Sequence, residues 1–88
     1  FRKLKVLNLK KTNITDESIE FMINCKFKQL EDLKLNRTNI TDKAIEYLLK
    51  CNFDFLKTLN LDNTKITNKS VENIIKCNFK NLQNLSLH

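Results

Sequence analysis

The sequence repeats itself at an interval of 26 residues, and this periodicity constrains its fold more than any other feature. The segment TNITD occurs at residues 12–16 and again at 38–42, and TKITN follows at 64–68. Similarity extends through the whole interval. Repeats of 20–50 residues are typical of solenoids, in which each unit buries its apolar face only against its neighbours. The chain divides into repeats at residues 4–29, 30–55 and 56–81, and residues 82–88 begin a fourth.

The first part of each repeat predicts a short strand. Leucines flank one polar residue at residues 7–9, 33–35 and 59–61. Period-two alternation places the leucines on a buried face and the polar residues on an outward face.

The second part of each repeat predicts a helix. It begins after Thr15-Asp16 and the equivalent pairs at 41–42 and 67–68, which are residue types that cap helix N-termini. Apolar residues then recur at helical spacing and predict one buried stripe. The stripe contains Ile19, Met22, Ile23, Ile45, Leu48, Leu49, Val71, Ile74 and Ile75. The helices are expected to end near Cys25, Cys51 and Cys77, with Phe27, Phe53 and Phe79 closing the turn to the next strand.

Stacking such units predicts a right-handed α/β solenoid. Strands in a sheet lie about 4.8 Å apart, whereas packed helices need about 10 Å. We therefore expect short parallel strands on a concave face and helices on a convex face. Each TNITD segment would form the corner between strand and helix. The hydroxyls of Thr12, Thr38 and Thr64 are expected to satisfy backbone groups that this corner leaves unpaired.

The run LxxLxLxxTxIT followed by a helix resembles the leucine-rich repeat. Leu4, Leu7, Leu9 and Ile14 carry this resemblance, and their equivalents recur in the next two repeats. The repeat length, the ITD triplet and the helix-end cysteine are similar to the cysteine-containing subclass found in F-box proteins, the substrate receptors of ubiquitin ligases. The resemblance implies a protein-binding module, either a substrate-receptor arm or a structural segment of a large assembly.

Both ends of the chain resemble internal repeats. A solenoid needs polar capping units at its ends, and neither the residues before Leu4 nor those after Leu82 have that character. We therefore expect the 88 residues to form a single leucine-rich-repeat fragment, made of three repeats and part of a fourth, of a longer solenoid that continues in both directions.

The residue types give little support to catalysis. The single histidine is His88, and a chain without glycine has no glycine-rich phosphate loop. The three cysteines are spaced by the repeat and form no CxxC motif, so we expect ladder positions in the core and neither metal nor cofactor. An odd number of core cysteines without a pairing pattern predicts a reducing, intracellular location. The sequence has no apolar run long enough for a membrane span.

The polar residues that point out of the strands are the candidate contacts for a protein partner. They vary between repeats while the core positions stay fixed, which fits a recognition surface but also an unconstrained one. The first two repeats are basic here and the third carries an acid, which predicts an acidic partner segment. The predicted concave-face residues are Val6, Asn8, Lys10, Lys11, Asp32, Lys34, Asn36, Arg37, Thr58, Asn60 and Asp62.

The aromatic residues and the net charge each allow more than one interpretation. Phe21, Tyr47 and Phe55 either pack on lysine stems and neighbouring helices or anchor a partner on the outer face. The net charge of +6 raises nucleic-acid binding as a less favoured alternative. The outward strand positions hold no Phe or Tyr on which bases could stack.

Overall fold

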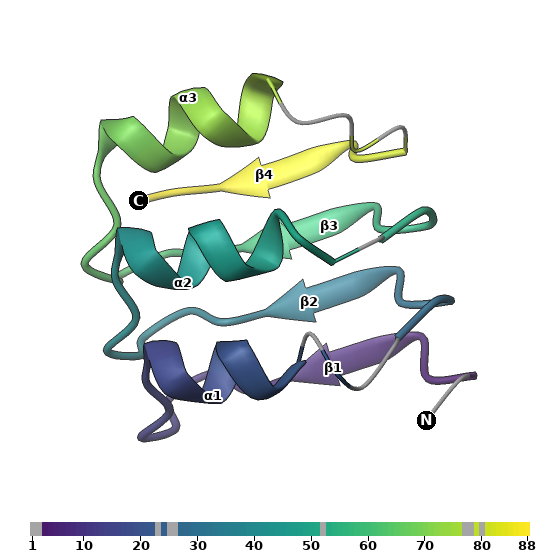
Figure 1. Ribbon diagram of the computed structural model, residues 1–88, viewed down its shortest axis with the longest axis horizontal. Coiled ribbons are helices and arrows are strands. Elements are labelled where there is room, and N and C mark those ends of the chain that lie inside the picture. The colour runs from purple at the N-terminus through teal and green to yellow at the C-terminus, as the bar shows by residue number, and fades with distance from the viewer. Residues whose placement is uncertain (1–2, 23, 25–26, 52, 77–78, 80) are drawn as a thin grey trace.

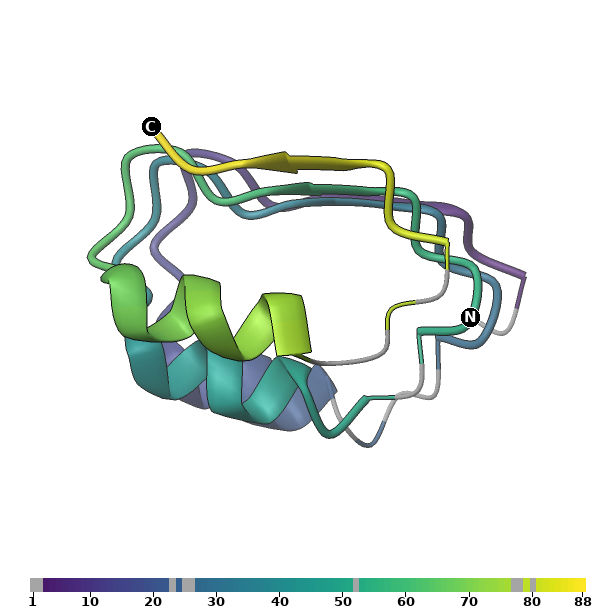
Figure 2. The ribbon, with the colours of Figure 1, turned by 90° about the horizontal axis from the view of Figure 1, so that it is seen from above.

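The computed structural model describes residues 3–22, 24, 27–51, 53–76, 79 and 81–88. Strands and helices alternate along the chain and form two layers, with the helices on one side of the sheet (Figures 1 and 2). The strands are β1 (Val6–Asn8), β2 (Asp32–Lys34), β3 (Thr58–Asn60) and β4 (Asn84–Ser86). The helices are α1 (Asp16–Met22), α2 (Asp42–Leu48) and α3 (Asn68–Lys76).

The strands form one parallel sheet in chain order. Equivalent residues of successive repeats face one another, so that Leu7 pairs with Leu33, Leu33 with Leu59 and Leu59 with Leu85. The 26-residue period is therefore also the register of the sheet. This register places the leucines in one continuous ladder.

The backbone ladder extends beyond the three residues of each strand. The Lys11 N–H donates to the Asn36 carbonyl at 3.1 Å, and the Arg37 N–H donates to the Asp62 carbonyl at 2.8 Å. The corners that follow the strands are thus held side by side like the strands themselves.

The predicted alternation is present in β2 and β3. Leu33 and Leu59 are buried, whereas Asp32, Lys34 and Thr58 are half-exposed on the other face. At about 25 cal/mol per Å² of apolar surface, each buried leucine stabilises the fold by about 2 kcal/mol. The buried core is Ile19, Met22, Leu30, Leu33, Leu35, Ile40, Ala44, Ile45, Leu48, Phe53, Leu56, Leu59, Leu61 and Ile74.

Ile75, a member of the predicted helical stripe, is exposed, and Leu49 and Val71 are half-buried. Ile74 lies in the core, but Ile75 is 73% exposed, so the predicted core position of Ile75 is wrong. Its equivalent Leu49 packs against the core. The difference follows from neighbours, because α2 contacts both α1 and α3, whereas α3 contacts α2 alone among the described helices. Ile23 lies outside the described residues.

The helix-to-strand turns agree with prediction in part. Phe53 is buried, and Phe27 and Phe79 are half-buried against the core. Cys51 is half-buried rather than fully buried, and its Sγ lies 3.8 Å from the Tyr47 carbonyl oxygen. Cys25 and Cys77 lie outside the described residues.

The threonines of the three corners satisfy backbone acceptors as expected. Thr12, Thr38 and Thr64 each donate from Oγ1 to the carbonyl three residues earlier, at 2.6, 2.7 and 2.8 Å. Thr38 is 5% exposed, whereas Thr12 is exposed. The same bond is therefore made in water in the first repeat and in the core in the second.

Each corner also contains a residue in the left-handed region of backbone conformation. Lys11 and Arg37 have φ of 58° and Asn63 has φ of 54°. Glycine usually occupies this conformation, because a Cβ atom raises the free energy of the left-handed backbone by about 1 kcal/mol. The chain contains no glycine, and it turns all three corners with residues that carry side chains.

Candidate binding surface

The predicted partner-binding residues lie on the strands and on the corners that follow them, and the helices cover one side of this sheet (Figure 2). The register aligns them in rows across the strands, so that Asn8 lies beside Lys34 and Lys34 beside Asn60. We call this surface the sheet face, and it comprises Val6, Asn8, Lys10, Lys11, Asp32, Lys34, Asn36, Arg37, Thr58, Asn60 and Asp62.

Two asparagines of the sheet face use their acceptor oxygens internally. Asn8 Oδ1 accepts from the Lys10 N–H at 3.1 Å, and Asn60 Oδ1 accepts from the Asp62 N–H at 3.0 Å. Within the described part of the chain, the amide nitrogens of Asn8 and Asn60 donate no hydrogen bond. These side chains therefore offer donors to a partner more readily than acceptors.

Asp62 carries the negative charge of the third corner. Its Oδ1 accepts from the His88 N–H at 2.8 Å and from the Ser86 hydroxyl at 2.6 Å. These two bonds, the backbone bond from His88 first, lower the pKa of Asp62 below its ordinary value. Asp62 is consequently a carboxylate at neutral pH.

Asp32 and Lys34 form an ion pair on β2. The Lys34 Nζ lies 3.9 Å from Asp32 Oδ2, and both side chains are partly exposed. Solvent screening makes such a pair worth at most about 1 kcal/mol. The positive charge of Lys34 is thus partly balanced, which places the basic character of the sheet face nearer to the corners than the sequence predicts.

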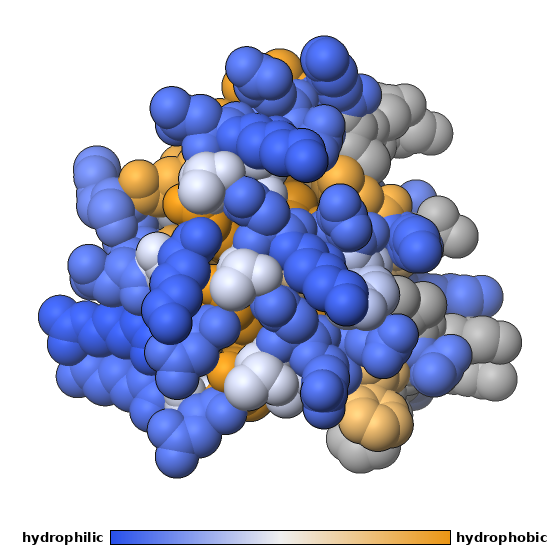
Figure 3. Space-filling view, turned by 60° about the vertical axis from the view of Figure 1, so that its left-hand side comes forward, coloured by the Kyte–Doolittle hydropathy of each residue, from blue (hydrophilic) through white to orange (hydrophobic). Residues whose placement is uncertain are grey.

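The corner cations are not balanced in this way. Lys10, Lys11 and Arg37 are exposed, and none of the three forms an ion pair among the residues that the structure describes. Hydrophilic side chains cover most of the corner side of the molecule (Figure 3).

A second polar arrangement, which sequence reasoning missed, links successive repeats. Asp16 Oδ1 accepts from the Thr41 N–H at 2.8 Å and Oδ2 accepts from the Thr41 hydroxyl at 2.7 Å. Thr41 is also the N-cap of α2 and accepts from the Lys43 N–H, as predicted. We call the Asp-to-Thr contact the inter-repeat clasp.

The clasp recurs one repeat later with an added donor. Asp42 accepts from the N–H and hydroxyl of Thr67 and from the Ser70 hydroxyl, at 2.8, 2.6 and 2.6 Å. Partial burial alone would raise the pKa of Asp42. The bonds from Ser70 and Thr67 and the charge of Lys69 outweigh that effect and lower the pKa. A signal for this contact exists in the sequence, since an acid and a threonine recur 25 residues apart.

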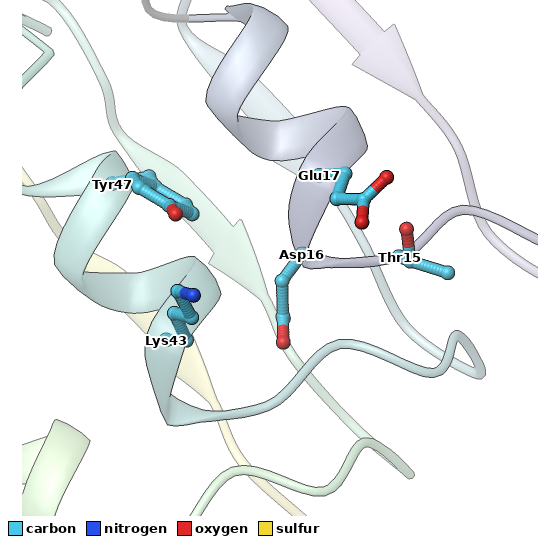
Figure 4. Close-up of a pocket in the computed structure, with 5 residues that line it drawn as sticks. All are labelled: Thr15, Asp16, Glu17, Lys43 and Tyr47. Carbon is cyan, nitrogen blue, oxygen red and sulfur yellow. The ribbon is translucent and has the colours of Figure 1, made fainter.

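An open hollow of about 360 Å³ lies beside the first clasp, between the beginnings of α1 and α2 (Figure 4). It holds two carboxylates and one ammonium group, so no single charge dominates it. One of the carboxylates, that of Asp16, already binds Thr41. The hollow was not predicted, and its lining residues are Thr15, Asp16, Glu17, Lys43 and Tyr47.

Residues 2–22 match the family described as Leucine Rich repeat. The match covers β1, the first corner and α1, which are the elements that each later repeat copies. The fold is a leucine-rich-repeat solenoid. A leucine-rich repeat indicates a protein–protein interaction module. A comparison with the curated proteins gives no match.

The aromatic residues of this leucine-rich-repeat solenoid differ in burial. Tyr47 is half-buried against the core, with the Lys50 Nζ 6.0 Å from its ring centroid, as the packing interpretation predicts. Phe21 is 73% exposed and Phe55 is 52% exposed, and neither is packed into the core. Their role as partner contacts stays a prediction.

Among the described residues, no group of three or more His, Cys, Asp or Glu side chains is placed to hold a metal ion. No helix in this part of the chain has the length and apolarity needed to cross a membrane.

Proposed function

We propose that this leucine-rich-repeat solenoid is a non-catalytic interaction module of an intracellular protein, and that its sheet face binds an acidic segment of a partner. The observation that supports this most directly is the imbalance between donors and acceptors on that face. Asn8 and Asn60 use their side-chain oxygens internally, and Lys10, Lys11 and Arg37 are exposed cations.

The asparagine contacts explain the imbalance. A side-chain amide has an acceptor oxygen and a donor nitrogen. In Asn8 and Asn60 the oxygen holds the backbone of the following corner. A partner that pairs with these two amides therefore has to supply acceptors, such as carboxylates or extended backbone carbonyls.

Charge supports the same partner. Lys10, Lys11 and Arg37 are exposed cations that lie on neighbouring corners. A row of unbalanced cations attracts carboxylates and speeds their association, and added salt weakens the effect. The chain as a whole carries a net charge of +6, which adds to the attraction.

The test is a charge reversal on the sheet face. Partners of the full-length protein would be purified from its native cell, and their affinities measured for wild type and for Lys34→Glu/Arg37→Glu. The control is Lys28→Glu/Lys50→Glu, which changes the net charge equally at exposed lysines in the helix-to-strand turns. We expect the first variant to lose a partner that the control retains. Equal affinity of both variants for every partner would contradict the proposal.

Two biological roles fit this module. The helix-end cysteine and the ITD triplet support a substrate-receptor arm of a ubiquitin ligase. The exposure of Phe21, Phe55 and Ile75 supports the alternative, a structural segment of a large assembly that covers these residues. Cullin-type ligase subunits in the purified sample would favour the first role. A fixed stoichiometric set without them would favour the second.

Nucleic-acid binding is the remaining candidate, and only the basic charge supports it. Phosphate contacts would make binding fall steeply with salt for any sequence of RNA or DNA. The same purified protein can be titrated with single-stranded RNA and duplex DNA as competitors of the protein partner.

A further inference from the structure

The geometry points to a partner segment of mixed charge, with an acidic residue over the cations of the first two corners and a basic residue over Asp62 of the third. This inference rests on the proposed function, because it specifies the segment that the sheet face binds. An entirely acidic segment fits the first two corners but not the third.

The third corner differs from the other two in its charges. Asn63 stands where Lys11 and Arg37 stand in the preceding repeats, and Asp62 stands where Lys10 and Asn36 stand. The third corner therefore combines a neutral amide with a carboxylate. An acidic partner residue placed there would meet a charge of its own sign.

The carboxylate of Asp62 is able to take a further bond. Both of its internal hydrogen bonds, from the His88 N–H and the Ser86 hydroxyl, end on Oδ1. Oδ2 accepts no hydrogen bond and joins no ion pair within the described residues. Asp62 is half-exposed, so Oδ2 is accessible to a cation.

The spacing of the corners sets the spacing of the charges in the segment. Lys10 and Asp62 occupy the same repeat position two layers apart, and adjacent layers are joined by backbone hydrogen bonds at the corners. Two inter-strand spacings amount to about 10 Å. An extended chain advances about 3.3 Å per residue, so the two charges of the segment lie about three residues apart.

The direction in which the segment runs follows from the same arrangement. The three charged corners form a row across the strands, so a segment that contacts all of them crosses the strands. Either chain direction satisfies the two charges, and the inference therefore specifies their spacing and not their order.

The first test is a peptide-display library selected on the full-length protein. We expect wild type to enrich peptides with Glu or Asp about three residues from Lys or Arg. Asp62→Asn should enrich the acidic residue alone. The control Asp54→Asn, at an exposed residue in the α2–β3 turn, should select the same peptides as wild type.

Selected peptides then give the quantitative test. Replacing the peptide cation by Gln should weaken binding to wild type about two- to fivefold, as expected for an exposed ion pair. The same replacement should have no effect on binding to Asp62→Asn. Moving the cation to six residues from the acid should cost as much as removing it.

The outcomes separate this inference from the proposed function. If wild type enriches acidic peptides without a spaced cation, or if the cation matters equally for Asp62→Asn, the mixed-charge inference is wrong and the proposed function stands. If acidic peptides are not enriched at all, or bind Lys34→Glu/Arg37→Glu as tightly as wild type, the proposed function fails, and the inference with it.

Discussion

The carboxylate of Asp42 holds Thr67 of the following repeat by two hydrogen bonds, 2.8 Å to its backbone N–H and 2.6 Å to its hydroxyl. Thr67 in turn accepts from the Lys69 N–H in the first turn of α3, at 3.4 Å. One acidic side chain thus connects the beginning of α2 to the beginning of α3. It acts between repeats, where a solenoid derives much of its stability.

Replacement of Asp42 should destabilise the protein measurably. Asp42→Ala leaves Thr67 and Ser70 without their acceptor, and we expect the free energy of unfolding to fall by about 1–2 kcal/mol. Chemical denaturation of wild type and variant measures the change. Asp54→Ala is the control, because Asp54 is exposed and its hydrogen bond with Asn81 uses the Asp54 backbone carbonyl. If Asp42→Ala lowered the free energy of unfolding no more than Asp54→Ala does, the clasp would contribute nothing to stability.

The same carboxylate should make stability depend on acid. The pKa of Asp42 is lower in the folded protein than its ordinary value of 3.8, so the folded state resists protonation more than the unfolded state. Its stabilising contribution is complete above the ordinary value and is lost as the pH falls through the lowered one. The gap in unfolding free energy between wild type and Asp42→Asn should accordingly shrink below 3.8. A gap that stays constant down to about pH 2 would refute this assignment.

The buried corner threonine should matter more than the exposed one. Thr38→Val removes the partner of the Leu35 carbonyl inside the core, and we expect a loss of about 1–3 kcal/mol. Thr12→Val removes the equivalent bond to Leu9 in water, where solvent replaces it, and should cost less than about 1 kcal/mol. Thermal and denaturant unfolding of the two variants give the comparison. Similar losses would mean that burial does not control this bond.

Glycine should stabilise the corners at their left-handed positions. Lys11→Gly removes the Cβ conflict at a φ of 58°, and we expect the free energy of unfolding to rise by up to about 1 kcal/mol. Asn63→Gly should gain less, because asparagine tolerates this conformation. Lys10→Gly, one residue earlier and without positive φ, should lower stability. Equal losses for Lys11→Gly and Lys10→Gly would disprove the effect.

The features that could be predicted from the sequence are those for which the same residue type recurs at the same position of each repeat. The leucine alternation predicted the sheet and its outward rows, and the recurring Thr12 position predicted the hydroxyl-to-carbonyl bonds of the corners. These follow from local periodicity, which one sequence displays three times over.

Contacts between repeats were harder to predict. Asp16 and Thr41 each suit a helix N-terminus, so local rules assign both to capping and give no reason to join them. The exposure of Ile75 depends on which helices flank α3, and the ion pair of Lys34 depends on how its side chain turns toward Asp32. Such features depend on tertiary arrangement and side-chain rotamers rather than on periodicity.

The absence of glycine from the corners also affects evolution of the surface. A glycine would relax the backbone at residues 11, 37 and 63 but would display nothing to a partner. By keeping a lysine, an arginine and an asparagine there, the chain accepts a less stable turn and gains three positions whose chemistry can change without altering the path of the backbone. On the function that we propose, selection for stability and selection for recognition are opposed at the same three residues, and new specificities can arise there without rebuilding the solenoid.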